Sequence, residues 1–161
     1  MIILSKNVNA NFIVGLFVVV VVASAALFMM TTFQSKVTLY LGDGVFDATI
    51  ANTQPAREKG LGGVSDLKPN QALILAFASD DKWPIWMKDM KVPIDIIWLD
   101  KDKKVIYIVK NASPDTSTDV IYTPKTDARY VVEVPSGTVE SKTIRTGRAA
   151  VFDIVEGDIK E

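Results

Sequence analysis

The hydrophobic positions divide the chain into an apolar N-terminal stretch and a longer region of short, strand-like segments. Residues 12–30 are apolar or small throughout, and this run of roughly 19 residues predicts a helix that can cross a bilayer. After residue 35, short apolar or alternating runs are separated by turn-forming residues, a pattern typical of strands. The expected strands are 37–41, 45–51, 71–77, 94–99, 105–109, 130–134 and 149–155, with a short extended piece at 120–122.

The segments between these strands leave room for short helices. Pro55 and Gly60 bracket a helix of two turns, and residues 138–146 allow a second one. The sequence therefore predicts a mostly β domain with a minor α+β character. We expect a small sandwich or a partly open barrel with one or two short helices, preceded by one N-terminal transmembrane helix.

The N-terminal run allows three interpretations: an uncleaved anchor, a cleaved signal peptide, or a core helix of a soluble protein. An uncleaved anchor is favoured, because the apolar run continues beyond the small residues that offer the alternative of signal cleavage near Ala25. The first 34 residues carry one charged side chain, Lys6, and the positive-inside rule favours a cytoplasmic N-terminus. We therefore expect a single-pass protein of the cell membrane that contacts the bilayer through 12–30. Residues 1–34 are the anchor or signal segment, and 35–161 form an exported, extracytoplasmic domain.

The composition excludes several kinds of chemistry. The chain has no cysteine and no histidine, so disulfides, thiolate nucleophiles, zinc–thiolate sites and a serine–histidine–aspartate triad are excluded. The formal net charge is −1, with both signs interspersed, which gives no indication of nucleic-acid binding. Asp100 and Asp102 have the first spacing of a calcium loop, but no further ligand follows. We expect no metal and no cofactor.

Asp95 is the most informative single position, because it lies within the apolar run 94–99. That run predicts a strand covered on both faces, and a carboxylate there is costly unless it is paired or hydrogen-bonded. One interpretation is a catalytic carboxyl with a raised pKa. The favoured interpretation is structural: an acceptor for backbone amides, or an ion pair with Arg57, Lys88 or Arg129.

Glu133 also lies in an apolar strand, and its alternation places it on the face of Val131, opposite Tyr130, Val132 and Val134. Glu133 and Asp95 are weak catalytic candidates as a carboxylate pair of the glycosidase kind, which requires a separation of about 5–10 Å in an open cleft.

The binding candidates are aromatic and cationic residues around the same segments. Trp83 and Trp86 can stack on a sugar or on an aromatic group, and Trp83 beside Pro84 is the expected solvent-facing platform. Lys88 and Arg57 complete this set together with Asp95, although packing is the favoured interpretation of the tryptophans and an ion pair that of Arg57.

Three segments carry a resemblance to a known family. They are A-R-E-K-G-L (56–61), W-M-K-D-M-K-V-P-I-D-I (86–96) and Y-V-V-E-V-P-S-G (130–137). Their order and spacing resemble the domain of unknown function 192, whose pattern reads R-x-x-G-L-M, then F-W-M-K-N-T-x-x-P-L-D-I, then V-L-E-L-P-A-G. The resemblance implies a small β-rich domain, often behind a signal or anchor, and it brings no established activity.

The chain departs from that pattern at three places. Gly62 stands in place of methionine, Asp89 and Met90 in place of Asn-Thr, and Gly147-Arg148 in place of Gly-Asp. If those polar positions bind a shared ligand, this chain has altered that ligand site.

The resulting functional hypothesis is an exported, membrane-anchored binding or structural module of the cell envelope, with a polysaccharide or a protein as partner. One alternative is a hydrolase that uses Asp95 and Glu133 on an envelope or extracellular substrate. Another is an assembly factor that captures a partner strand, which requires a long, unpaired edge strand free of proline and lysine.

Overall fold

The computed structural model describes residues 14–21, 35–114 and 120–160. Residues 14–21 are helical, and the chain divides into two compact units, Met1–Phe33 and Gln34–Glu161. Among the described residues, no helix combines the length and the apolar character that crossing a membrane requires. Most of the expected membrane segment 12–30, and the cleavage position near Ala25, lie outside the described residues, so both stay predictions.

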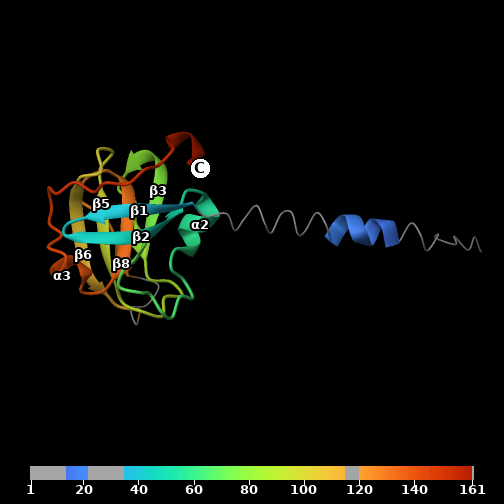
Figure 1. Cartoon of the computed structure of the whole chain (residues 1–161), viewed down its shortest axis with the longest axis horizontal. Coiled ribbons are helices and arrows are strands. Elements are labelled where there is room, and N and C mark those ends of the chain that lie inside the picture. The colour runs from blue at the N-terminus through green and yellow to red at the C-terminus, as the bar shows by residue number, and fades with distance from the viewer. Residues whose placement is uncertain (1–13, 22–34, 115–119, 161) are drawn as a thin grey trace, which may run out of the picture. The chain divides into compact units, whose positions relative to one another are not determined.

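Within the described residues, the β-rich domain is built on a six-stranded sheet and a separate two-stranded sheet (Figure 1). The six strands are β1 (Lys36–Leu41), β2 (Gly44–Ala51), β3 (Gln71–Asp81), β5 (Ile94–Leu99), β6 (Val105–Ala112) and β8 (Ala128–Pro135). The small sheet pairs β4 (Ile85–Trp86) with β7 (Ile121–Tyr122). The helices are α2 (Gln54–Lys59), α3 (Thr138–Ser141) and the 3-10 helix η1 (Glu156–Asp158). The expected mostly β fold with short helices is confirmed.

The large sheet is mixed, with the strand order β1-β2-β3-β8-β5-β6. β2 and β3 are parallel, whereas the other neighbouring pairs are antiparallel. Because parallel neighbours need a crossover connection, the chain passes through α2 between β2 and β3. β8 comes late in the chain but lies between β3 and β5, so it completes the centre of the sheet.

Each face of the sheet is covered by its own hydrophobic cluster, and all six residues of β5 are buried. Ile97 and Leu99 pack in the first cluster with residues of β1 and β2, the two strands that pass across the front of the domain in Figure 1. Ile96 and Trp98 pack in the second cluster with Met87. The prediction of a strand covered on both sides is confirmed.

The edges of the sheet are joined by the segment that follows α3. Val151 exchanges two backbone hydrogen bonds with Tyr40 of β1, at 2.9 and 2.8 Å. The backbone of Val105 in β6 bonds to both Gly147 and Arg148, at 2.8 Å each. The prediction of a strand over 149–155 is wrong. This segment makes isolated β-bridges at the two edges of the sheet instead of pairing along one of them.

The same edges do not match the requirement of a strand-capturing factor. β1 begins with Lys36 and is bonded at Tyr40 to Val151. β6 carries Lys110, and its first residue, Val105, bonds to the segment that follows α3. Lysines on edge strands and bridged edges both oppose the addition of a partner strand.

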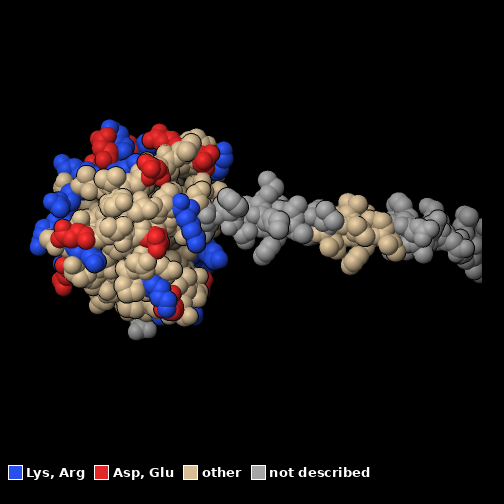
Figure 2. Space-filling model, viewed as in Figure 1, with Lys and Arg blue, Asp and Glu red and all other residues tan. Residues whose placement is uncertain are grey.

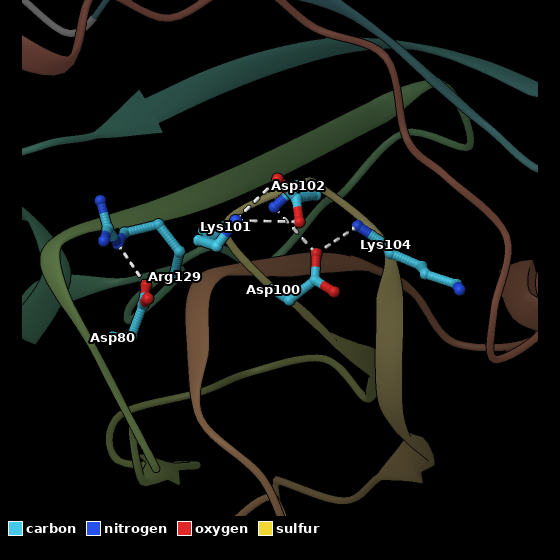
Figure 3. Close-up of polar contacts among 6 residues, drawn as sticks. All are labelled: Asp80, Asp100, Lys101, Asp102, Lys104 and Arg129. Carbon is cyan, nitrogen blue, oxygen red and sulfur yellow. Dashed lines mark hydrogen bonds and ion pairs between the residues drawn. The ribbon is translucent and has the colours of Figure 1, made fainter.

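The turn between β5 and β6 is fixed by a single carboxylate (Figure 3). Oδ1 of Asp100 accepts hydrogen bonds from the backbone N–H groups of Asp102 and Lys104, both at 2.9 Å. At the same end of the sheet, Nε of Arg129 on β8 binds Oδ1 of Asp80 on β3 at 2.6 Å. The acidic spacing noticed at Asp100 and Asp102 thus belongs to a turn. In the part of the chain that the structure describes, no cluster of three or more metal-ligating side chains occurs.

Candidate functional site

The two predicted carboxylates lie on opposite faces of the sheet. In the antiparallel pairing of β5 with β8, Asp95 is opposite Val134 and Glu133 is opposite Ile96. Residues directly opposite one another share a face, whereas neighbours along a strand alternate. Asp95 therefore points to the face of Val134 and Glu133 to the face of Ile96. With the sheet between them, the geometry does not provide the carboxylate pair that the hydrolase hypothesis needs.

Asp95 is a structural acceptor. Its side chain is 1% exposed. Oδ1 accepts a hydrogen bond from the backbone N–H of Asn111, and Oδ2 accepts one from the backbone N–H of Val139, each at 2.8 Å. This single carboxylate joins β5 to β6 and to the first turn of α3. Of the interpretations offered by the sequence, acceptance of backbone amides is the one that the geometry supports. Arg129, one of the expected cationic partners, binds Asp80 instead.

Glu133 lies in a very different environment, although it is equally buried. It is 4% exposed, and a backbone hydrogen bond from Leu61 reaches its carboxyl group. Within the described part of the chain, its Oε2 has no hydrogen-bond partner. Burial raises the pKa of Glu133 from 4.5 to about 7, and the Leu61 hydrogen bond opposes this rise. Glu133 therefore exchanges its proton near neutral pH.

Gly60 sets the approach of Leu61 to this carboxyl group. Gly60 ends α2 with φ 50° and ψ −135°, a conformation that is open almost only to glycine. A Cβ atom at this position would lie 3.7 Å from Oε2 of Glu133. The glycine thus turns the chain sharply beside the carboxyl group, which brings the next backbone N–H within hydrogen-bonding reach.

A pocket of about 570 Å³ opens beside Glu133. It lies between α2 and the segment that contains β4, over the ends of β3 and β8. Its lining residues are Gln54, Arg57, Glu58, Lys59, Gly60, Leu61, Leu75, Phe77, Ala78, Ser79, Trp83, Pro84, Ile85, Trp86, Lys88, Met90, Ile121 and Glu133. Of the predicted binding residues, Arg57, Trp83, Trp86 and Lys88 line this pocket, whereas Asp95 does not. Their binding role stays a prediction.

Arg57 connects α2 to the floor of the pocket. Its Nη1 donates a hydrogen bond to the backbone carbonyl of Ala76 on β3 at 3.0 Å. Its guanidinium carbon lies 5.2 Å from the ring centroid of Phe77, a cation–π distance. These contacts hold the short helix against the sheet.

Of the two pocket tryptophans, Trp86 has the exposed ring and Trp83 is partly buried. Trp83 is partly buried and stacks on Phe77, with ring centroids 4.1 Å apart and planes inclined by 8°. Its backbone carbonyl accepts a hydrogen bond from Nε1 of Trp98 at 2.9 Å. Trp86 is 47% exposed, and Nζ of Lys88 lies 5.8 Å from its ring centroid. The expectation that Trp83 is the solvent-facing platform is wrong, because its ring is held by Phe77; Trp86 is the exposed ring.

A family profile matches nearly all of the β-rich domain. The profile is that of an uncharacterized ancient conserved region, the domain of unknown function 192 (DUF192), and it matches residues 37–152. The chain belongs to the DUF192 family. A UPF0127 protein of Thermococcus gammatolerans is 35% identical to it over 109 residues, which are 66% of this chain and 67% of that protein.

Solved structures share the DUF192 fold of this chain. A protein of unknown function from Novosphingobium aromaticivorans aligns with a TM-score of 0.66 and 24% identity, over 73% of this chain and 84% of that one. A Sinorhizobium meliloti protein described as a candidate transcription regulator aligns with a TM-score of 0.64 and 24% identity, over 74% and 93%. At this identity the likeness establishes the fold alone.

The DUF192 motifs converge on the pocket. The first contributes Gly60 and Leu61, the second contributes Trp86 and Lys88, and the third contributes Glu133. Sequence reasoning selected residues from each motif but did not bring them together, since their meeting depends on the long-range pairing of β8. It also missed the apolar walls from β3 and β7, because such residues have the pattern of ordinary core residues.

One departure from the DUF192 pattern falls on the pocket wall. Met90 stands where the family pattern has threonine, and it lines the pocket. A thioether side chain in place of a hydroxyl group makes this wall more apolar than the family pattern implies.

Proposed function

We propose that this DUF192 domain is a binding module for a small, largely apolar ligand that occupies the pocket beside Glu133. The observation that supports it is Oε2 of Glu133, a buried carboxyl oxygen at the pocket that has no hydrogen-bond partner within the described residues. A buried polar atom without a partner is costly, and a ligand that reaches this oxygen removes that cost. Glu133 was a weak catalytic candidate in the sequence and is here a ligand contact.

The pocket has the dimensions and the chemistry of a small-molecule site. Its volume of about 570 Å³ lies within the range of about 300–1,000 Å³ that is typical of ligand pockets. Its walls are mainly apolar and aromatic, with Trp86 exposed at the mouth and the Phe77–Trp83 stack beside it. A few polar groups among apolar walls fix the orientation of a ligand.

We further propose that the domain is held at the extracytoplasmic side of the cell membrane by the apolar segment 12–30. The absence of cysteine from the chain allows a clean test with Asp66→Cys, since the Asp66 side chain is 68% exposed. A membrane-impermeant maleimide added to intact cells should label this variant. Labelling that requires cell lysis would contradict the proposed side.

Occupancy of the pocket is tested by NMR on the full chain in lipid nanodiscs, with indole and 1-methylindole as probes. Both probes should shift the side-chain N–H signals of Trp83 and Trp86, while the amide of Leu39 in the other cluster stays in place. Ala78 lines the pocket, and the larger side chain of Ala78→Trp should fill it and weaken the affinity for both probes by about tenfold or more. Thr38→Trp on the exposed side of β1 is the matched control and should leave binding unchanged. Equal binding by the wild type and Ala78→Trp would reject the pocket as the site.

A further inference from the structure

The two oxygens of the Glu133 carboxyl group differ in what reaches them. The backbone N–H of Leu61, just after α2, donates a hydrogen bond to the carboxyl group, whereas Oε2 has no partner among the described residues. The neighbouring strands add no polar atom from their side chains, because Leu73 of β3 and Ile96 of β5 lie directly opposite Glu133. A partner for Oε2 can therefore come from the pocket.

The charged groups around the pocket restrict the charge of that partner. α2 contributes Arg57, Glu58 and Lys59, and the segment after β4 contributes Lys88. These three cations outnumber the two anions, Glu58 and Glu133, so the pocket lining is net positive. An ammonium ligand would gain little from a buried ion pair with Glu133, because the desolvation of both charges offsets their attraction. The partner of Oε2 is therefore better supplied by an uncharged donor.

The walls restrict the body of the ligand. The Phe77–Trp83 stack and the ring of Trp86 present flat aromatic surfaces, and Leu75 and Met90 present apolar ones. Flat apolar molecules bury their surface against such walls in offset-stacked or edge-to-face contacts. A planar ring system fits this lining better than a sugar does, because most of a sugar's hydroxyl groups would remain without partners.

We infer that the ligand of the proposed pocket is an uncharged, planar, apolar molecule with one N–H or O–H donor, which binds Oε2 of Glu133. This inference rests on the proposed binding function and specifies the class of ligand. The donor stabilises the ionised carboxylate, since hydrogen bonds to a charged acceptor are stronger than those to a neutral one. A ligand of the same shape without a donor leaves Oε2 without a partner.

The inference has a consequence for pH that can be measured with a definite sign. A donor ligand lowers the pKa of Glu133 from about 7, because it favours the ionised form. By linkage, such a ligand binds best above pH 7 and weakens by up to about tenfold for each pH unit below it. A ligand without a donor does not lower the pKa of Glu133, because it offers the ionised form no hydrogen bond.

The test is a pH titration of the Glu133 carboxyl carbon by ¹³C NMR in the full chain in nanodiscs. It is run without probe, with saturating indole, and with saturating 1-methylindole, which has the same ring but no N–H donor. Indole should lower the pKa of Glu133 and bind about tenfold more tightly than 1-methylindole at pH 8. The Asp95 carboxyl carbon is the internal control, because it faces the other cluster and should not respond to either probe. Glu133→Gln should bind the two probes with affinities that do not depend on pH.

The outcomes separate the ligand class from the binding function. If neither probe lowers the pKa of Glu133 and both bind equally well, the pocket is occupied but no donor reaches Oε2; the inference fails and the proposed function stands. If neither probe changes the titration of Glu133 or the signals of Trp83 and Trp86, both the inference and the proposed pocket are rejected. A lowering by indole alone supports both.

Discussion

At the scale of single residues, Glu133 and Asp95 show how burial alone does not define a role. Both carboxyl groups are almost completely buried. Asp95 has a backbone donor on each oxygen, whereas Glu133 accepts from Leu61 and its buried Oε2 has no partner within the described residues. A carboxylate with both oxygens satisfied stabilises its neighbours, and one with an unsatisfied oxygen beside a pocket favours a ligand that supplies a donor.

The raised pKa of Glu133 predicts a characteristic pH dependence of stability. Because this pKa rises from 4.5 to about 7 on folding, the folded protein binds the proton more tightly than the unfolded chain. The stabilisation is complete below pH 4.5 and is lost as the pH rises to about 7. This difference corresponds to about 3 kcal/mol of unfolding free energy.

Glu133→Gln should remove this contribution, because glutamine does not titrate. Urea unfolding of both proteins between pH 4 and 8 measures the difference. The unfolding free energy of the wild type should fall relative to that of the variant over this range, and the variant should be the more stable protein at pH 8. Parallel pH profiles would show that the Glu133 carboxyl titrates normally in the folded protein.

At the scale of secondary-structure elements, Asp95 joins three of them. It lies on β5 and accepts from Asn111 at the end of β6 and from Val139 in α3. The bond from Val139 is buried, and the bond from Asn111 is partly buried. α3 is only four residues long, so this tertiary contact matters more to it than its own hydrogen bonds do.

Asp95→Asn should lower the unfolding free energy by about 1–3 kcal/mol, because an amide can accept only one of the two N–H donors and turns its own donor toward the other. Urea unfolding of the wild type and the variant at pH 7 measures the loss. Asp102→Asn is the matched control, because the Asp102 side chain is 74% exposed. The unfolding free energy of this variant should stay within about 0.5 kcal/mol of the wild-type value. Equal midpoints and slopes for the wild type and Asp95→Asn would exclude a stabilising role for this carboxylate.

The elements were largely predictable from local sequence, whereas their assembly was not. Alternation located the strands, and it also placed Glu133 with Val131 and away from Tyr130, as the two clusters confirm. The register of β5 against β8 depends on residues nearly forty positions apart, and only that register shows that Asp95 and Glu133 diverge. The stacking of Trp83 on Phe77 is a local contact, but it depends on how the chain turns after β3, which strand alternation does not show.

At the scale of the whole domain, one short segment holds both edges of the large sheet. Val151 bonds to Tyr40 of β1, and Gly147 and Arg148 bond to Val105 of β6. Nearby, Phe152 is buried, with its ring at right angles to that of Tyr130. Figure 2 shows acidic and basic side chains interspersed on the viewed face of this domain, with no extended area of one sign.

Val151→Pro should lower the unfolding free energy by about 1–3 kcal/mol, since proline removes the N–H that bonds to the Tyr40 carbonyl at 2.8 Å. The β1 edge should open, and light scattering after size exclusion should detect association of the variant. Val155→Pro is the control, because Val155 is 67% exposed and its φ of −89° is close to the value that proline adopts. A monomeric Val151→Pro protein with wild-type stability would show that the bridge to β1 is dispensable.

The position of this closing segment in the chain has a consequence for biosynthesis. The two edges it bonds, near residues 40 and 105, leave the ribosome well before residues 147–151 do. Until then the nascent domain exposes unpaired backbone groups at both margins, and such margins recruit other nascent chains. Any pause in translation before residues 147–151 are made lengthens that exposure.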